Sequence, residues 1–364
     1  MEKQEILIGI KEAQLAFFGK ELTECTRYGN GHINDTFLAV DGARFVLQRI
    51  NSVVFPKPRE VMENILGVTR HVCEKASALG QDPRRASLVV VTTKDGAPVF
   101  LDSKGGWWRV YEFAEGTVAR DRIEDPQDFY TCAKAFGAFQ RQLSDYPAEK
   151  LHETIVNFHN TPVRYQNLMR AIEKDPVGRV ATVGAEIDFA KARKAFSETL
   201  ENAHHEGRLP LRVTHNDTKL NNILFDAVTG EPVCVIDLDT VMPGYSVNDF
   251  GDSIRFGANT AAEDETDLSK VSLDLDLFEL YAKGFLEGCD GKLTPAELEL
   301  LPVGAMMMTL ECGMRFLTDY IEGDVYFRIH RPGHNLDRAR NQFALVADME
   351  KKLPEMRAII EKLK

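Results

Sequence analysis

Two polar motifs joined by a hydrophobic hairpin constrain this chain more than any other feature of its sequence. The first is a His-x-Asp sequence that ends at Asp217 and is followed five residues later by Asn222; the second is Asp237. An apolar run precedes Asp237, and the turn sequence of residues 226–230 can fold that run back on the strand after Asn222. The sequence therefore predicts that Asn222 and Asp237 lie at one edge of a hairpin.

This spacing is typical of a phosphoryl-transfer site, where the protein positions the reactants and neutralises charge. Asp217 can accept the proton of an attacking hydroxyl, and a carboxylate in that role contributes about 10²–10⁴-fold. Asn222 and Asp237 can hold Mg²⁺ against the phosphates of ATP, because Mg²⁺ needs few protein ligands besides water and phosphate. Either motif alone also fits an ordinary strand-end turn, but the two together favour kinase chemistry.

The length and the order of expected elements predict a two-lobed α+β protein. A chain of 364 residues is too long for one average domain. We expect a mainly antiparallel N-terminal sheet in residues 1–115 that binds nucleotide, and a larger, mostly helical C-terminal lobe in residues 116–364 that carries the catalytic loop. The expected helices cover residues 1–22, 59–79, 128–143, 186–205 and 268–364, and the expected N-terminal strands cover 25–28, 35–40, 44–50, 88–92, 98–101 and 107–113.

A glycine-containing turn precedes the third expected strand and is a candidate cover for the phosphates. Glycine allows the backbone to approach anions closely, and successive N–H groups can cradle phosphate oxygens. An ordinary hairpin turn uses the same residue types, and the third glycine of the usual pattern is missing. The candidate nucleotide-binding residues of this turn are Gly29, Gly31, His32, Ile33 and Asn34.

Two further strands supply candidate nucleotide contacts. Gln48 stands on the third strand where protein kinases place a lysine, and its amide can donate to a phosphate oxygen. Glu60 and Glu63 on the following helix are both candidate partners for it, and the sequence does not choose between them. Glu112 and Phe113 end the last strand and resemble a hinge whose backbone hydrogen-bonds adenine.

The overall charge and the cysteine pattern exclude several other functions. The formal net charge is −12, without a Lys/Arg block that could follow a nucleic-acid backbone. The six cysteines are scattered, without metal-binding spacing, which favours free thiols in a reducing cytoplasm. No signal peptide and no run of 18 apolar residues are found, so we expect a cytoplasmic protein without a membrane span. No obligate protein partner is indicated.

Segments spread along almost the whole chain resemble the aminoglycoside phosphotransferase and choline kinase superfamily, whose fold is protein-kinase-like. The segments that carry the resemblance are residues 29–34, 45–48, 108–111, 158–162, 212–222, 236–240, 249–257, 311–317 and 323–327. The C-terminal segments are more specific than the kinase loop, which many small-molecule kinases share. The turn has Asn30 where related sequences have aspartate.

The resemblance implies transfer of the ATP γ-phosphate to the anomeric 1-hydroxyl of a sugar, N-acetylglucosamine or N-acetylgalactosamine. It assigns Asp217 as the catalytic base that also contacts the sugar, and Asp237 as a metal ligand. Arg315 and Tyr326 would hold the sugar from the helical lobe. The residues by themselves would make Arg315 a surface ion-pair residue and Tyr326 a packing residue.

Two alternatives remain open at this point. The chain could be another small-molecule kinase of the superfamily, acting on choline, an amino alcohol or an aminoglycoside; an arginine in the acceptor site argues against such cationic substrates. It could also be an inactive binding protein, an idea whose only support is the missing strand lysine. Nothing in the sequence ranks the individual sugars, because that choice depends on one hydroxyl or acyl group.

Overall fold

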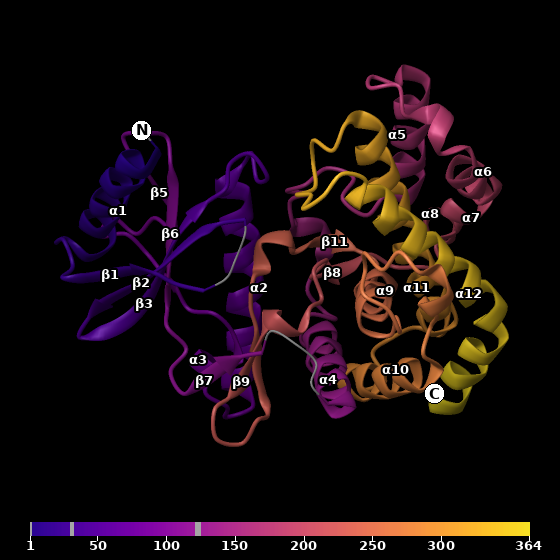
Figure 1. The fold of residues 1–364 in the computed structure, drawn as a ribbon. Helices are drawn as coiled ribbons and strands as arrows, with labels where there is room; N and C mark the ends of the chain where they lie inside the picture. Colours follow the sequence, from indigo (N-terminus) through magenta and orange to yellow (C-terminus); the bar gives the residue numbers. More distant parts are fainter. Residues whose placement is uncertain (1, 30–32, 121–124) are drawn as a thin grey trace. The chain divides into compact units, whose positions relative to one another are not determined.

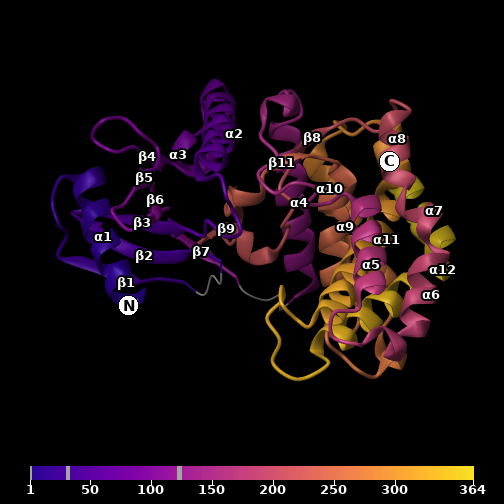
Figure 2. The ribbon, with the colours of Figure 1, turned by 90° about the horizontal axis from the view of Figure 1, so that it is seen from above.

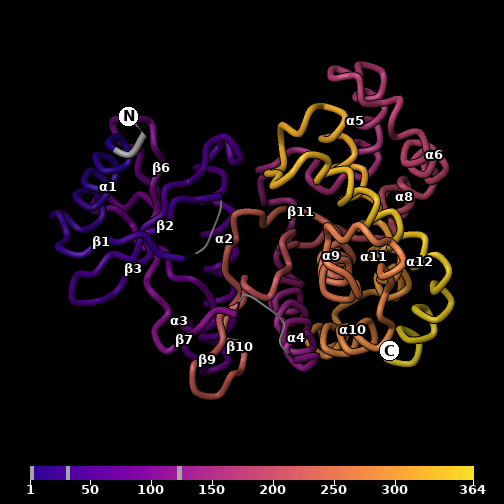
Figure 3. The backbone as a smooth tube through the Cα atoms, viewed as in Figure 1, coloured from indigo at the N-terminus to yellow at the C-terminus, as the bar shows by residue number. Residues whose placement is uncertain are grey.

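A computed structural model of the chain describes residues 2–29, 33–120 and 125–364 (Figure 3). The chain divides into two compact units, each assembled from separated stretches of sequence. Unit 1 consists of residues 1–120, 145–156 and 222–242, and unit 2 consists of residues 121–144, 157–221 and 243–364. The chain passes from unit 2 to unit 1 between Asn221 and Asn222, inside the expected catalytic loop.

Unit 1 is built on an antiparallel sheet with the strand order β1-β2-β3-β6-β4, and β5 also pairs with β6 (Figure 1). Gly42 adopts a positive φ of 71° and closes the tight turn between β2 and β3, a conformation that favours glycine. The strands are β1 (Glu24–Arg27), β2 (Asp35–Asp41), β3 (Ala43–Ile50), β4 (Val90–Val91), β5 (Phe100–Leu101) and β6 (Trp107–Glu112).

One face of this sheet is covered by the helix α1 (Glu2–Phe18), as Figure 2 shows. Ile10, Ala13 and Phe17 of α1 are buried in a cluster with Leu47 and Trp108 of the sheet. Strand residues that alternate with these point to the opposite face, because side chains alternate along a strand. The polar pair Gln48 and Arg109 therefore lies on the face away from α1.

Unit 1 also contains a second sheet and two further helices. The sheet has the order β10-β9-β7, and its β9–β10 hairpin is the one expected between the two motifs. The elements are α2 (Pro58–Ala78), α3 (Pro83–Ala86), β7 (Thr117–Ala119), β9 (Ile223–Asp226) and β10 (Pro232–Val235).

Unit 2 is helical and is organised around α11 (Pro295–Glu322). Thr294 and Glu297 form a capping box at its start, and Gly323 ends it at a φ of 101°. By length and composition α11 could cross a membrane, but 94% of its most apolar window is buried within the fold, as in a core helix. The other elements are α4 (Pro126–Gln142), α5 (Thr161–Lys174), α6 (Gly184–Ala192), α7 (Lys194–Ser197), α8 (Thr199–His205), β8 (Arg212–Thr214), β11 (Met242–Gly244), α9 (Ser246–Gly257), α10 (Leu275–Cys289) and α12 (His334–Leu363).

The predicted α+β class, with an antiparallel sheet followed by a mostly helical part, is confirmed. Several local predictions were wrong. The expected helix at 186–205 is broken into α6, α7 and α8, β4 and β5 have two residues each, and α5 and β7 were not anticipated. The strand β7 was missed because three residues carry too short an alternation to be recognised.

Candidate active site

The β9–β10 hairpin brings Asn222 and Asp237 to the same end of unit 1. Val235 pairs with Ile223 across the hairpin, and the Ile236 N–H donates to the Asn222 carbonyl at 2.9 Å. Asp237, the next residue, has a φ of 57°, in the left-handed region that aspartate tolerates better than most residues. Asn222, which is buried, directly precedes β9, and Asp237, which is exposed, lies two residues after β10.

This donor set fits a divalent cation of the Mg²⁺ type. One amide and one carboxylate are the hard oxygen ligands that Mg²⁺ takes, with water and phosphate filling the remaining positions. Within the described ranges, no group of three or more His, Cys, Asp or Glu side chains could hold a metal ion.

The candidate base Asp217 lies in unit 2, in a loop that Asp249 of α9 holds from beneath. The Asp249 carboxylate accepts the N–H groups of His215 and Asn216 at 2.9 and 2.8 Å, and the Gln140 amide at 2.8 Å. Burial raises the pKa of Asp249. Asp249 lies inside the helix α9, from which its carboxylate supports the backbone of the loop ahead of Asp217.

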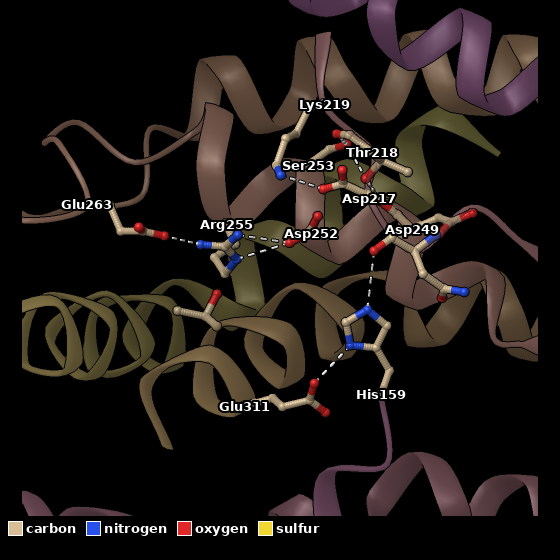
Figure 4. A network of polar contacts seen from close by, with 12 residues as sticks. His159, Asp217, Thr218, Lys219, Asp249, Asp252, Ser253, Arg255, Glu263 and Glu311 are labelled. Atoms are coloured by element: carbon tan, nitrogen blue, oxygen red, sulfur yellow. Dashed lines mark hydrogen bonds and ion pairs between the residues drawn. The ribbon is translucent and has the colours of Figure 1, made fainter. Parts of the chain in front are cut away.

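Lys219 is a candidate functional residue that the sequence interpretation missed. Its Nζ atom lies 2.5 Å from an Asp217 carboxylate oxygen (Figure 4). Burial has the largest single effect on the pKa of Lys219 and lowers it, but the charge and hydrogen bond of Asp217 together with other acidic groups outweigh burial, and the pKa is raised. Asp252 adds to this effect, and it is held in turn by Arg255 at 2.9 Å. The sequence feature that could have identified Lys219 is its position two residues after the candidate base.

Arg315 of α11 lies among aromatic rings of unit 2 and has no hydrogen bond or ion pair within the described part of the chain. Its guanidinium carbon is 5.5, 5.9 and 5.4 Å from the ring centroids of Phe158, Tyr326 and Phe327. Burial lowers the pKa of the neighbouring Arg164, and the charge of Arg315 lowers it further. This cluster combines cationic donors with aromatic surface, and Tyr326 is 68% exposed at its edge.

Two buried acids one turn to either side of Arg315 on α11 organise its surroundings. Glu311 binds His159 Nδ1 at 2.8 Å and the Thr161 hydroxyl at 2.8 Å, and His159 Nε2 lies 3.5 Å from the Asn216 carbonyl of the catalytic loop (Figure 4). Asp319 holds the segment that contains Tyr326. Residues four apart share one face of a helix, so Glu311, Arg315 and Asp319 lie on the same side of α11.

In unit 1, Gln48 does not pair with either acid suggested for it. Its carbonyl accepts from Arg109 Nε at 2.9 Å and its amide donates to the Thr36 hydroxyl at 3.0 Å. Glu60 pairs with Lys57, and Glu63 pairs with His152. Arg109 is thus a second residue that the sequence interpretation missed.

The N–H groups of the candidate hinge residues Glu112 and Phe113 already donate hydrogen bonds to other backbone carbonyls. Glu112 donates to the Val89 carbonyl at 2.9 Å and Phe113 donates to the Arg44 carbonyl at 3.0 Å. A cavity of about 430 Å³ lies beside them in unit 1. Its lining includes Arg44, Arg84, Glu112, Phe113, Glu115 and Cys234. A base in this region would therefore need other backbone groups than these two N–H donors.

The expected phosphate-covering turn is described only at its ends. Gly29 has a φ of 74°, as a turn glycine can, and Ile33 is half exposed. Asn34 donates to the Asp239 carboxylate at 2.6 Å and accepts the Asn51 N–H at 2.9 Å. Gly31 and His32 lie outside the described residues.

An antiparallel sheet followed by helices, with an Asp-containing loop ahead of a hairpin that ends in Asp, defines the kinase-like class of phosphotransferases. The family model of the phosphotransferase enzyme family matches residues 24–275, more than half of the chain. The chain therefore belongs to the phosphotransferase enzyme family.

Solved structures of similar fold are distant in sequence. A microcompartment-associated aminopropanol kinase is 17% identical, with a TM-score of 0.60 and coverage of 96% of this chain and 98% of that one. An aminoglycoside phosphotransferase from Alicyclobacillus acidocaldarius is 15% identical, with a TM-score of 0.61 and 96% coverage of both chains. A choline kinase from Cryptosporidium parvum is 13% identical, with a TM-score of 0.56 and coverage of 99% and 98%. At these identities the likeness shows the fold alone.

Proposed function

We propose that the protein is a small-molecule kinase that uses ATP and Mg²⁺ to phosphorylate the anomeric 1-hydroxyl of N-acetylhexosamines, an N-acetylhexosamine 1-kinase. The observation that carries this proposal is the Arg315 cluster, where a half-buried guanidinium faces aromatic rings instead of a carboxylate. A neutral sugar needs directional hydrogen-bond donors and an apolar surface against its ring, and this cluster offers both.

The cluster is joined to the candidate base by direct contacts within unit 2. Phe158 packs on His159 with ring centroids 4.4 Å apart, and His159 approaches the carbonyl of Asn216, the residue before Asp217. An acceptor held by Arg315 and Tyr326 would thus lie on the part of unit 2 that carries Asp217. Asp217 would then orient the 1-hydroxyl and take its proton during transfer.

Charge favours a neutral acceptor over a cationic one. Arg164 and Arg315 are close enough that the charge of one lowers the pKa of the other. Two buried acids of the same helix as Arg315 are engaged, Glu311 by His159 and Thr161, and Asp319 by backbone N–H groups. Choline, amino alcohols and aminoglycosides carry positive charge, which two arginines repel. The proposal therefore places the acceptor among sugars rather than amines.

The nucleotide and metal sites belong to the same proposal. Structures of two aminoglycoside phosphotransferases with this fold contain ADP and GDP. We assign ATP to the lobe of residues 1–115, beside Gln48, Glu112 and Phe113, and under the turn that includes Gly29, Gly31, His32, Ile33 and Asn34. Asn222 and Asp237 would hold Mg²⁺, which neutralises phosphate charge when bound. Residues 116–364 would form the lobe with the catalytic loop and sugar site, in a cytoplasmic protein.

The test is product formation from ATP and Mg²⁺ with N-acetylglucosamine, N-acetylgalactosamine, galactose, glucose, choline and kanamycin. Phosphorus NMR would identify the phosphorylated position, and we expect an anomeric 1-phosphate from the N-acetylhexosamines. Phosphorylation of choline or kanamycin in preference to every sugar would overturn the sugar assignment. An absence of transfer to any acceptor, in a protein that still binds ADP, would favour an inactive binding protein.

A further inference from the structure

A buried arginine in unit 1 occupies the region where kinases use a strand lysine. Gln48 of β3 stands at the lysine position and pairs across the sheet with Arg109 of β6. The Arg109 side chain is 2% exposed and that of Asp239 is 3% exposed, and the two form an ion pair. Burial has the largest single effect on the pKa of Arg109 and lowers it, but the charge and hydrogen bond of Asp239 together with other negative groups outweigh burial and raise the pKa. The arginine therefore stays charged beside Asp239.

The geometry of this pair is bidentate and shared with two other elements. Arg109 Nη2 lies 2.9 Å from Asp239 Oδ2, and Arg109 Nη1 hydrogen-bonds Asp239 Oδ1. Gln48 accepts from Arg109 Nε, and Asn34 donates its amide to Asp239 Oδ2 at 2.6 Å. The Asp239 carboxylate thus connects β6 with Asn34, the residue before β2. The Arg109 guanidinium connects the same carboxylate with Gln48 of β3. Bidentate pairs of this kind restrict orientation as well as contributing energy.

Asp239 lies two residues after Asp237, so this network acts on the backbone of the candidate metal ligand. On the other side, Ile236 is hydrogen-bonded to Asn222 at 2.9 Å. Asp237 is therefore held between two anchored neighbours, in a left-handed conformation with a φ of 57°. A residue other than glycine keeps a left-handed backbone conformation only where the surrounding structure holds it there.

We propose that Arg109 and Asp239 form a positioning pair that orients the Asp237 carboxylate for a divalent cation bound with nucleotide. The inference rests on the proposed function, because it takes Asp237 as a ligand of the ATP-bound metal. It adds that Arg109 on β6 supports the loop that carries Asp237, and that Gln48 supports Arg109. Arg109 and Asp239 are both buried, so neither is assigned a contact with ATP.

The experiment measures nucleotide and metal binding separately from turnover. Isothermal titration calorimetry gives the affinity of the full chain for ADP without metal and with Mg²⁺, and electron paramagnetic resonance gives the affinity for Mn²⁺ in the presence of ADP. The variants are Asp239→Asn and Arg109→Lys. The control is Glu297→Gln, which breaks the ion pair of the buried Glu297 with Arg212 in unit 2. Circular dichroism establishes that each variant is folded.

We expect Asp239→Asn to change the metal-free ADP affinity by less than about twofold and to weaken Mn²⁺ binding by about 10–100-fold, the range for residues that orient metal ligands. Arg109→Lys should show a smaller loss of the same kind, because lysine cannot form the bidentate pair. If Asp239→Asn does not fold, Arg109→Lys decides the question. The control should keep the Mn²⁺ affinity of the wild type.

Wild-type Mn²⁺ affinity in a folded Asp239→Asn or Arg109→Lys protein would overturn the inference while leaving the proposed function intact. An equal loss in the Glu297→Gln control would overturn it as well, since the effect would then be general destabilisation. A wild-type protein that binds ADP without any metal dependence would contradict the metal part of the proposed function itself. Sugar phosphorylation by the wild type tests the remaining part.

Discussion

The Asp319 carboxylate accepts the backbone N–H of Tyr326 at 2.7 Å, seven residues along the chain. It also accepts the N–H groups of Val325 and Phe327 at 2.9 Å each, and the Asn335 amide at 2.8 Å. One buried acid therefore fixes the loop that places Tyr326 and Phe327 against Arg315.

Replacement of Asp319 should affect the acceptor selectively. We expect Asp319→Ala to raise the KM for N-acetylglucosamine by about tenfold or more, since several charge-assisted bonds worth about 1.5–3 kcal/mol each are lost. The KM for ATP should change by less than about twofold. Asp319→Asn keeps one acceptor oxygen for Val325 and Tyr326 and should recover part of the loss. Steady-state kinetics with each substrate varied in turn would measure both values, and an equal rise in both KM values would refute this role.

Arg315 can be tested by its charge and its shape. We expect Arg315→Met to keep the fold, because within the described residues Arg315 has no ion pair to lose. Sugar phosphorylation should fall by about 10²-fold in kcat/KM, as expected for the loss of one or two charge-assisted hydrogen bonds. Arg315→Lys should recover little, because lysine lacks the planar fork. A Met variant with unchanged kcat/KM for sugars would remove Arg315 from the acceptor site.

Variants of Asp217 and Lys219 should distinguish an effect on turnover from an effect on substrate binding. Asp217→Asn removes the proton acceptor, so kcat should fall by about 10²–10⁴-fold while ADP binding stays within about twofold of the wild type. Lys219→Met removes the charge 2.5 Å from Asp217 and should lower kcat with a smaller change in the KM for the sugar. Stopped-time assays with calorimetry would give these values. An Asp217→Asn protein with full turnover would show that Asp217 is not the base.

The pair of Glu297 and Arg212 should govern acid stability. The Glu297 side chain is buried, which alone would raise its pKa, but hydrogen bonds from Arg212 and Ser246 lower the pKa below the usual value. A lowered carboxylate pKa stabilises the fold above the unfolded value of about 4.3, and this stabilisation is lost as pH falls through the lowered folded value. Glu297→Gln should cost about 1.5–3 kcal/mol at pH 7, the range for a hydrogen bond to a charged group, because Arg212 keeps its hydrogen bond to the Lys292 carbonyl at 2.9 Å.

Denaturant titrations at several pH values would check this prediction. The difference in unfolding free energy between the wild type and Glu297→Gln should be constant above about pH 5.5 and should shrink below about pH 4. A difference that does not depend on pH would mean that Glu297 carries no linked proton. A difference that grows in acid would reverse the sign of the pKa shift.

The hairpin and the catalytic loop were predictable because their information is local. The turn at residues 226–230 lies between two apolar runs, and the pairing it specifies places Asn222 beside Ile236. The strands β2, β3 and β6 were likewise predicted, while β4 and β5 have too few residues for boundaries to be read from a pattern.

The environments of the key charged side chains could not be read from the sequence. Arg109 and Asp239 are 130 residues apart, and nothing local in either segment indicates that they pair. The sequence made Glu60 and Glu63 equally good candidate partners for Gln48. In the structure Glu60 pairs with Lys57 and Glu63 pairs with His152. Arg315 looked like a surface ion-pair residue until packing placed rings around it.

The sequence by itself therefore determined the order of elements, the fold class and the spacing of the candidate catalytic side chains, because short-range periodicity and turn chemistry depend on neighbours in the chain. The tertiary structure alone decided which charges are buried, which acid meets which base, and that Asp319 holds the loop of Tyr326. Those outcomes depend on burial and on contacts between distant segments, which no local pattern encodes.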